Sequence, residues 1–296
     1  MIINPEFDRF VQAELEQLRS SADAHRRAPP SRLLYPTDAA GLDAVIRSGA
    51  LPAWDWRLAH EPALVRYGVE LVEEFLAQPA HRADDALRTR FRQAALANLH
   101  PRGTHFDGFV ARLFEHAAPN AAAHCPGYAL GVRTGALPAQ PQHAIYERAQ
   151  QCAIVASAYQ ACEDYFVGAV ARFGERVGSD LLTPCWDTFR HLIGPFLMRF
   201  RDPALAHQHE WTVVAPAPSG PAPQADPVRF AIVDNRLVPH AALVLGARPL
   251  ESIAIAPALP FATTREALRA YLRRRHMGGL ALVPVAGCGI SEATIA

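Results

Sequence analysis

Apolar residues recur along this chain at two different spacings, which together predict an α+β fold. Helical spacing predicts helices over about 5–26, 39–47, 61–77, 84–98, 148–173, 179–200 and 263–275. Short apolar or alternating runs predict strands at 33–35, 51–56, 127–132, 143–147, 210–214, 228–233, 237–238, 241–245, 251–256 and 280–285. Helices and strands do not alternate regularly, so we expect a mostly antiparallel sheet with a helical front half packed around it.

Two segments differ from the rest in composition. Residues 100–126 are rich in His, Pro, Gly and Asn, which predicts a long irregular segment with one short helix near 107–116. Residues 215–227 are rich in Pro and Ala, which predicts a hairpin loop or a flexible excursion. We expect residues 1–296 to form a single α+β domain, with the helix at about 5–26 preceding its core.

Charge and hydropathy narrow the partners and the cellular location that we expect for the protein. The 29 basic and 29 acidic residues give a formal net charge of zero, which disfavours nucleic acid as a partner. No apolar run approaches the roughly 18–20 residues that a membrane span needs. The first residues lack the basic and apolar regions of a signal peptide. We therefore expect a cytoplasmic protein without a membrane partner.

The chain contains no lysine, so its 29 Lys and Arg residues are all arginines. Schiff-base catalysis needs a lysine amine, so pyridoxal-phosphate enzymes are excluded. The phosphate-binding loop of NTPases, the protein kinases and the Ser-Lys hydrolases also depend on a lysine. The sequence also lacks the Gly-x-Ser-x-Gly, His-Glu-x-x-His and Gly-x-Gly-x-x-Gly motifs. The sequence therefore excludes most of the common classes of enzyme.

The five cysteines are Cys125, Cys152, Cys162, Cys185 and Cys288. Their number is odd, and no two show the Cys-x-x-Cys spacing of a zinc knuckle. We therefore expect reduced thiols in the core. One alternative is that Cys125 or Cys288 acts as a nucleophile beside a histidine.

Several segments, in order, resemble a bacterial family of unknown function whose members begin with a Tyr-His-Tyr-Thr-like strand. The matching runs are Leu34-Tyr35-Pro36-Thr37, residues 41–51 followed by Trp54, Gly127-Tyr128-Ala129-Leu130-Gly131-Val132, Gln208-His209-Glu210-Trp211, Leu237-Val238-Pro239-His240 and Ile253-Ala254-Ile255-Ala256-Pro257. Their order and spacing hold over roughly residues 33–291. By its pattern this family is similar to the ADP-ribosyltransferase fold, in which a split antiparallel sheet holds NAD in a cleft.

The resemblance implies an enzyme that cleaves the nicotinamide–ribose bond of NAD and transfers ADP-ribose to an acceptor. Glu210 would bind the ribose and stabilise its oxocarbenium-like cation, with Gln208 on the same face of the strand, toward the acceptor. The residues that would contact NAD are Tyr35, Thr37, Tyr128 and Arg66, with Arg133 as an alternative to Arg66. NAD would then be a substrate, and no metal is expected.

Two other functions stay open. His207, His209 and Glu210 offer two imidazoles and a carboxylate within four residues, a set suited to a metal-dependent hydrolase, with His60, His124 or Cys125 as a further ligand. Alternatively, the chain is a non-enzymatic interaction protein on an inherited enzyme scaffold. Residues 100–126 and 215–227 would then be binding loops for a protein partner.

Overall fold

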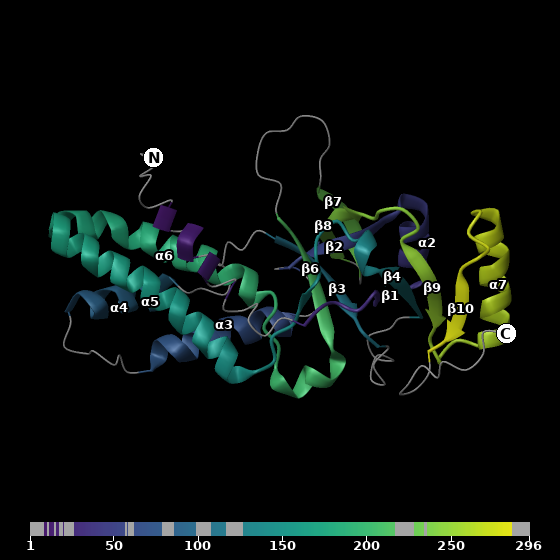
Figure 1. Ribbon diagram of the computed structural model, residues 1–296, viewed down its shortest axis with the longest axis horizontal. Helices are drawn as coiled ribbons and strands as arrows, with labels where there is room; N and C mark the ends of the chain where they lie inside the picture. The colour runs from purple at the N-terminus through teal and green to yellow at the C-terminus, as the bar shows by residue number, and fades with distance from the viewer. Residues whose placement is uncertain are drawn as a thin grey trace, which may run out of the picture. The chain divides into compact units, whose positions relative to one another are not determined.

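The structure is a computed structural model that describes residues 27–56, 58, 62–78, 86–98, 108–116, 127–216, 228–233 and 236–285, together with part of the segment 9–20. These residues form an α+β protein with a largely antiparallel sheet, which confirms the predicted α+β class and the mostly antiparallel sheet (Figure 1). The strands are β1 (Arg32–Thr37), β2 (Ala50–Asp55), β3 (Gly108–Phe114), β4 (Tyr128–Arg133), β5 (Gln142–His143), β6 (Glu210–Pro216), β7 (Val228–Val233), β8 (Arg236–Val244), β9 (Leu250–Ile255) and β10 (Ala281–Pro284). The longer helices are α2 (Ala39–Ser48), α3 (Pro62–Ala77), α4 (Ala86–Asn98), α5 (Arg148–Phe173), α6 (Glu175–Leu197) and α7 (Phe261–Arg274).

The described residues divide into two compact units. A helical unit contains residues 59–107 and 145–203, and a sheet unit contains residues 28–58, 108–144 and 204–296; the first 27 residues group with the helical unit. Whether residues 1–296 fold as a single domain, as the sequence predicts, is not decided by this division. Most of the predicted helix at 5–26 lies outside the described residues, although its described positions, such as Phe10 and Glu14, are helical.

The sheet divides at β3. One edge of β3 pairs with β6 along its whole length. On the other edge, β2 pairs at Phe109 and Val110 and β1 pairs at Phe114. Two groups of strands therefore diverge from β3, namely β10-β9-β4-β1 and β2-β8-β7, while β6 continues to the short strand β5.

The larger apolar cluster of the sheet unit lies on one face of the sheet, with α2 and α7, and a smaller one that includes Leu34 lies on the other face. Leu42 and Val45 of α2 and Leu268 and Leu272 of α7 belong to the larger cluster. Local chemistry sets the ends of α2. The Asp38 carboxylate accepts a hydrogen bond of 2.6 Å from the Gly41 amide, and Gly49 ends the helix with a φ of 64°.

In the helical unit, α5 and α6 lie side by side (Figure 1). Aromatic rings fill the space between its helices. Phe91 of α4 lies 5.5 Å from both Tyr159 and Phe166 of α5, and Tyr159 lies 6.0 Å from Phe189 of α6 (ring centroids). Such ring pairs stabilise a core beyond the area they bury.

The largest error of the sequence prediction concerns residues 107–116. They were expected to form a short helix in an irregular segment, but residues 108–114 form β3 at the junction of the sheet. Phe109 and Leu113 are four residues apart and Ala, Arg and Leu favour helices, so local sequence is ambiguous here. Pairing on both edges of the strand decides the outcome.

Smaller differences concern strand lengths. Pro36 does not stop β1, because Pro36 pairs with Ala129 and the strand continues to Thr37. The strand predicted at 143–147 is reduced to Gln142–His143. The two strands predicted at 237–238 and 241–245 are one strand, β8.

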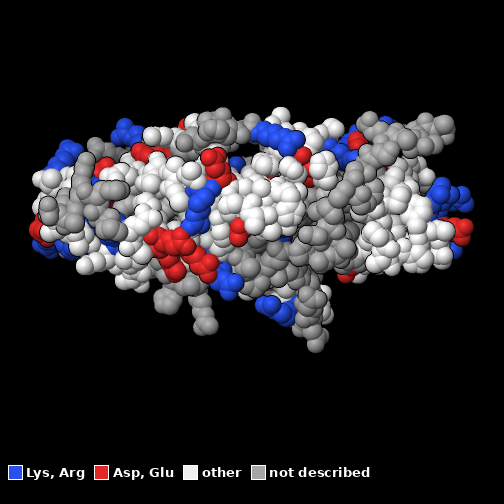
Figure 2. Space-filling model, turned by 90° about the horizontal axis from the view of Figure 1, so that it is seen from below, with Lys and Arg blue, Asp and Glu red and all other residues white. Residues whose placement is uncertain are grey.

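The surface of the described residues carries charges of both signs. Figure 2 shows basic and acidic side chains interspersed with broad uncharged areas on the face drawn. No described helix combines the length and the apolar character needed to cross a membrane.

Candidate functional site

Glu210, the predicted catalytic carboxylate, is fully buried at the start of β6. Both its oxygens accept hydrogen bonds from Arg112 of β3, at 2.9 Å from Nε and 2.7 Å from Nη2. Gln208 is not on this strand, because it is the last residue of the 3₁₀ helix Pro203–Gln208. His209 separates them with a φ of 45°. The expected alignment of Gln208 and Glu210 on one strand face was therefore wrong.

The predicted NAD contacts of β1 and β4 lie on the other face of the sheet from Glu210. Leu34, Phe114 and Glu210 are direct cross-strand partners, so their side chains share one face. Tyr35 is the next residue after Leu34 and belongs to the core on the opposite face.

Thr37 and its partner Tyr128 share the face of Tyr35. Burial raises the pKa of Tyr35 to about 12 and so keeps the phenol neutral. Tyr35, Thr37 and Tyr128 therefore do not converge with Glu210.

The two predicted pyrophosphate ligands form ion pairs at the surface. Arg66 is in the helical unit, on α3, where its Nε lies 3.3 Å from Glu70 Oε1. Arg133 ends β4 and donates a 2.8 Å hydrogen bond from Nε to Glu251 Oε1. Both side chains are more than half exposed, as expected for solvated arginines.

A different set of side chains converges at one end of β6. Glu115, His143 and His209 each place one potential ligand atom so that these atoms lie within 4.8 Å of one another. Glu115 is buried, and the two histidines are half-buried. Atoms that share one Zn²⁺ lie at most about 4.4 Å apart, because each is about 2.0–2.2 Å from the metal. The spread of up to 4.8 Å is slightly wider than this limit, so the side chains would have to move closer together to bind one ion.

Strand pairing brings these residues together. Trp211 of β6 pairs with Leu113 of β3 on one side and with His143 of β5 on the other. Glu115 directly follows β3, and its amide donates a 3.3 Å hydrogen bond to the carbonyl of His209. The three candidate ligands thus come from the ends of three neighbouring strands. The positive φ of His209 turns its backbone out of the strand conformation at this point.

Trp211 contacts two of the three candidate ligands. Its indole Nε1 donates a 2.9 Å hydrogen bond to Glu115 Oε1, and its ring lies edge-on to His143 with a centroid distance of 5.0 Å. Trp211 is 1% exposed and belongs to the core of the sheet unit. It therefore orients Glu115 through the hydrogen bond to Oε1.

His116 is the exposed group beside this cluster. Its side chain is 69% exposed, its Nε2 lies 3.9 Å from Glu115 Oε2, and its ring lies 6.0 Å from that of His209. An imidazole in this position can exchange protons between solvent and a group bound at the cluster.

The metal set predicted from sequence, His207, His209 and Glu210, does not form. His207 lies in the 3₁₀ helix and is exposed, and its Nδ1 contacts the carbonyl of Ala204 at 2.9 Å. Glu210 is paired with Arg112. The further ligands considered, His60, His124 and Cys125, lie outside the described residues. Only His209 is common to the predicted and the observed clusters.

Among the described cysteines, Cys162 and Cys185 are buried and free, and Cys152 is half-buried. Burial raises the pKa of Cys162 well above its usual value and that of Cys185 to about 12, so neither is an activated nucleophile. Cys125 and Cys288, the nucleophiles considered from sequence, lie outside the described residues.

Glu115 and His143 were missed because each is ordinary in its local context. Glu115 fell in the segment expected to be irregular, and His143 opened a predicted strand without another histidine in it. The ligands are far apart along the chain, so no spacing motif connects them. A prediction of residues 108–114 as a strand would have placed Glu115 at a strand end, as a candidate ligand.

Comparison of the chain with protein-family models, with curated proteins and with solved structures found no match.

Proposed function

We propose that this protein is a metal-dependent hydrolase whose metal ion is bound by Glu115, His143 and His209. The observation that carries the proposal is the approach of one carboxylate and two imidazole nitrogens within 4.8 Å. Two histidines and one glutamate are a known ligand set of catalytic zinc, and they leave a coordination position for water. The indole–carboxylate hydrogen bond of Trp211 adds the outer-shell support that such sites have.

The chemistry proposed is water activation at a single metal. A metal held by Glu115, His143 and His209 would supply an activated water for hydrolysis of a carboxylic ester or amide. His116 would accept a proton from that water and return it to the leaving alkoxide or amine when the bond to the carbonyl carbon breaks. A mononuclear site favours a carbonyl substrate over phosphate esters, many of which are cleaved by paired metals.

The test compares apo protein, prepared with EDTA, with protein reloaded with Zn²⁺ or Co²⁺, using p-nitrophenyl acetate as substrate. Reloading should restore turnover. His116→Asn should lower turnover by about 100-fold, the typical minimum for a general base, while Zn²⁺ affinity stays unchanged. Equal rates for the apo and reloaded proteins would contradict the hydrolase. Retention of iron with oxygen-dependent chemistry would point instead to a two-histidine-one-carboxylate oxygenase.

Trp211→Phe is expected to lower Zn²⁺ affinity by about 10–100-fold, because Glu115 loses the donor that orients it. Affinity is measured by competition with a chromophoric chelator. The matched control is Trp186→Phe, which changes another buried tryptophan in the helical unit and should leave Zn²⁺ affinity unchanged. In a Glu115→Ala background, Trp211→Phe should have no further effect. A full effect there would show that Trp211 does not act through Glu115.

The NAD-dependent transferase implied by the resemblance is a second proposal with a separate test. It requires Glu210 to leave Arg112 and contact ribose. If it holds, the protein releases nicotinamide from NAD, and Glu210→Gln abolishes that release without abolishing NAD binding. The transferase proposal is contradicted if the wild type releases no nicotinamide, or if Glu210→Gln releases as much as the wild type.

A further inference from the structure

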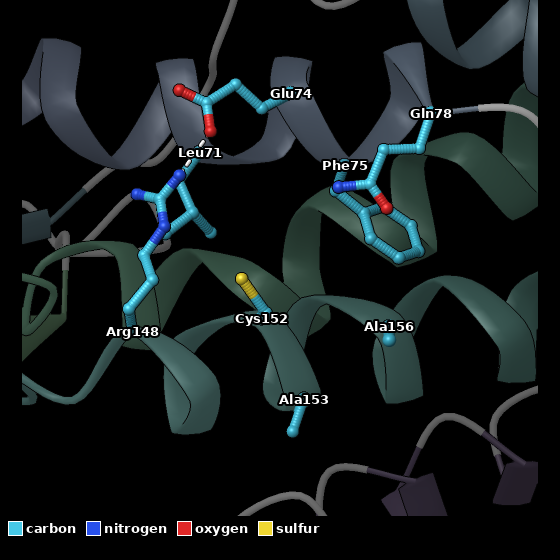
Figure 3. Close-up of a pocket in the computed structure, with 8 residues that line it drawn as sticks. All are labelled: Leu71, Glu74, Phe75, Gln78, Arg148, Cys152, Ala153 and Ala156. Atoms are coloured by element: carbon cyan, nitrogen blue, oxygen red, sulfur yellow. Dashed lines mark hydrogen bonds and ion pairs between the residues drawn. The ribbon is translucent and has the colours of Figure 1, made fainter.

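The helical unit contains a cavity of about 340 Å³ between α3 and α5. Cavities that bind small molecules measure roughly 300–1,000 Å³. The lining residues are Leu71, Glu74, Phe75 and Gln78 on the α3 side and Arg148, Cys152, Ala153 and Ala156 on α5 (Figure 3). The cavity therefore lies between one helix with large side chains and one with small side chains.

The cavity has an apolar middle and polar ends. In Figure 3, the ion pair of Arg148 and Glu74 lies at one end and Gln78 at the other. Between them, the Cys152 sulfur points into the space between the two helices, toward α3. A ligand that fills this space would contact apolar groups along its body and a cation at one end.

A chain of hydrogen bonds holds Arg148 in place. Arg148 Nη1 donates to Tyr67 Oη at 3.3 Å, and Tyr67 Oη donates to Gln151 Oε1 at 2.8 Å. Gln151 is fully buried, and its Nε2 donates to the carbonyls of Ile145 and Arg201. The hydrogen bonds thereby connect the guanidinium to the core of the helical unit, while the Arg148 side chain stays 41% exposed.

The counterion of Arg148 is exchangeable. Glu74 approaches Arg148 Nη2, but the Glu74 side chain is 62% exposed. Exposed ion pairs of this kind contribute little net free energy, because water solvates both partners well. A carboxylate with an apolar body that fills the cavity can therefore replace Glu74.

We propose that this cavity binds an amphiphilic carboxylic acid. Its carboxylate pairs with Arg148, and its aliphatic chain lies against Leu71 and Phe75 and beside the Cys152 thiol. Arginine suits this role because its planar guanidinium can donate two hydrogen bonds to one carboxylate.

Decanoate, used below its micellar concentration, is the probe, and Cys152 is the reporter. N-ethylmaleimide alkylation of Cys152 is followed by mass spectrometry of its peptide, with the buried Cys162 and Cys185 as internal controls. At a decanoate concentration ten times its Kd, the alkylation of Cys152 should slow by about 10-fold, because about one site in eleven is then open. Alkylation at an unchanged rate at every concentration would overturn the proposal.

Two variants then separate a ligand site from a structural ion pair. Arg148→Gln should weaken decanoate binding by about 10-fold or more, while decanol, which has no carboxylate, is unaffected. Glu74→Gln should strengthen decanoate binding, because it removes the competing carboxylate. Circular dichroism confirms that both variants are folded. Equal weakening by the two variants would show that the pair only stabilises the helices, which would also overturn the proposal.

Discussion

His143→Ala is expected to abolish stoichiometric metal binding. Purified without chelators, the wild-type protein should carry about one transition metal ion per chain by elemental analysis. Loss of an outer-shell group alone costs about 10–100-fold in metal affinity, so loss of a ligand should cost about 100-fold or more. Glu115→Ala and His209→Ala should behave in the same way, because each supplies one of three ligand atoms.

His207→Ala is the matched control for this experiment. His207 is exposed in the 3₁₀ helix Pro203–Gln208, two residues before His209, and should not affect metal affinity. The two metal hypotheses make opposite predictions here. Loss of metal in His207→Ala together with retention in His143→Ala would contradict the cluster seen in the structure and favour the set expected from sequence.

Arg112→Ala is expected to destabilise the junction of β3 and β6 by about 3–5 kcal/mol. The substitution removes the guanidinium that pairs with the fully buried Glu210 carboxylate, and loss of a charged partner at a buried position is costly. The effect should be largest in the pairs between Phe114 and Glu210 and their neighbours on the two strands. Hydrogen exchange of the β3 and β6 amides measures it locally.

Controls for this prediction use the second partner. Glu210→Gln removes the charge but keeps a similar shape, so it should cost less than Arg112→Ala. Replacement of both residues by methionine should be close to neutral, because the desolvation penalty disappears with the pair. If the β3 and β6 amides exchange no faster in Arg112→Ala than in the wild type, then Arg112 and Glu210 do not form a stabilising pair.

A stabilising role for Glu210 changes how the Gln208–Trp211 run is understood. Sequence placed a carboxylate at a strand entry, where it could serve a ligand. In the structure Glu210 faces one side of the sheet with Arg112, while Trp211, which donates a hydrogen bond to Glu115, faces the core on the other side. The alternation of side chains along the strand separates the two roles.

Much of the fold could be predicted from periodicity alone. The bounds predicted for α5, 148–173, are those observed, and β7 at 228–233 was also placed correctly. The cap of α2 by Asp38 followed from local chemistry, because a capping bond spans only three residues. Such features depend on neighbours in the chain, so the sequence contains the information directly.

The candidate site could be predicted only in part. His209 was a candidate ligand in the sequence prediction, but its partners were sought among neighbours in the chain. The actual partners, Glu115 and His143, become adjacent through the pairing of β3 and β5 with β6. Local pattern does not specify this register, since a shift by one residue would turn each side chain to the other face.

By itself, the sequence determined the α+β class and most helices and strands. It also excluded the chemistries that need a lysine. The tertiary structure alone decided that 108–114 is a strand, that Glu210 pairs with Arg112, and that Glu115, His143 and His209 converge. The physical reason is the same in each case. Contacts between residues distant in the chain depend on which strands pair and in what register, and those contacts decide which side chains meet.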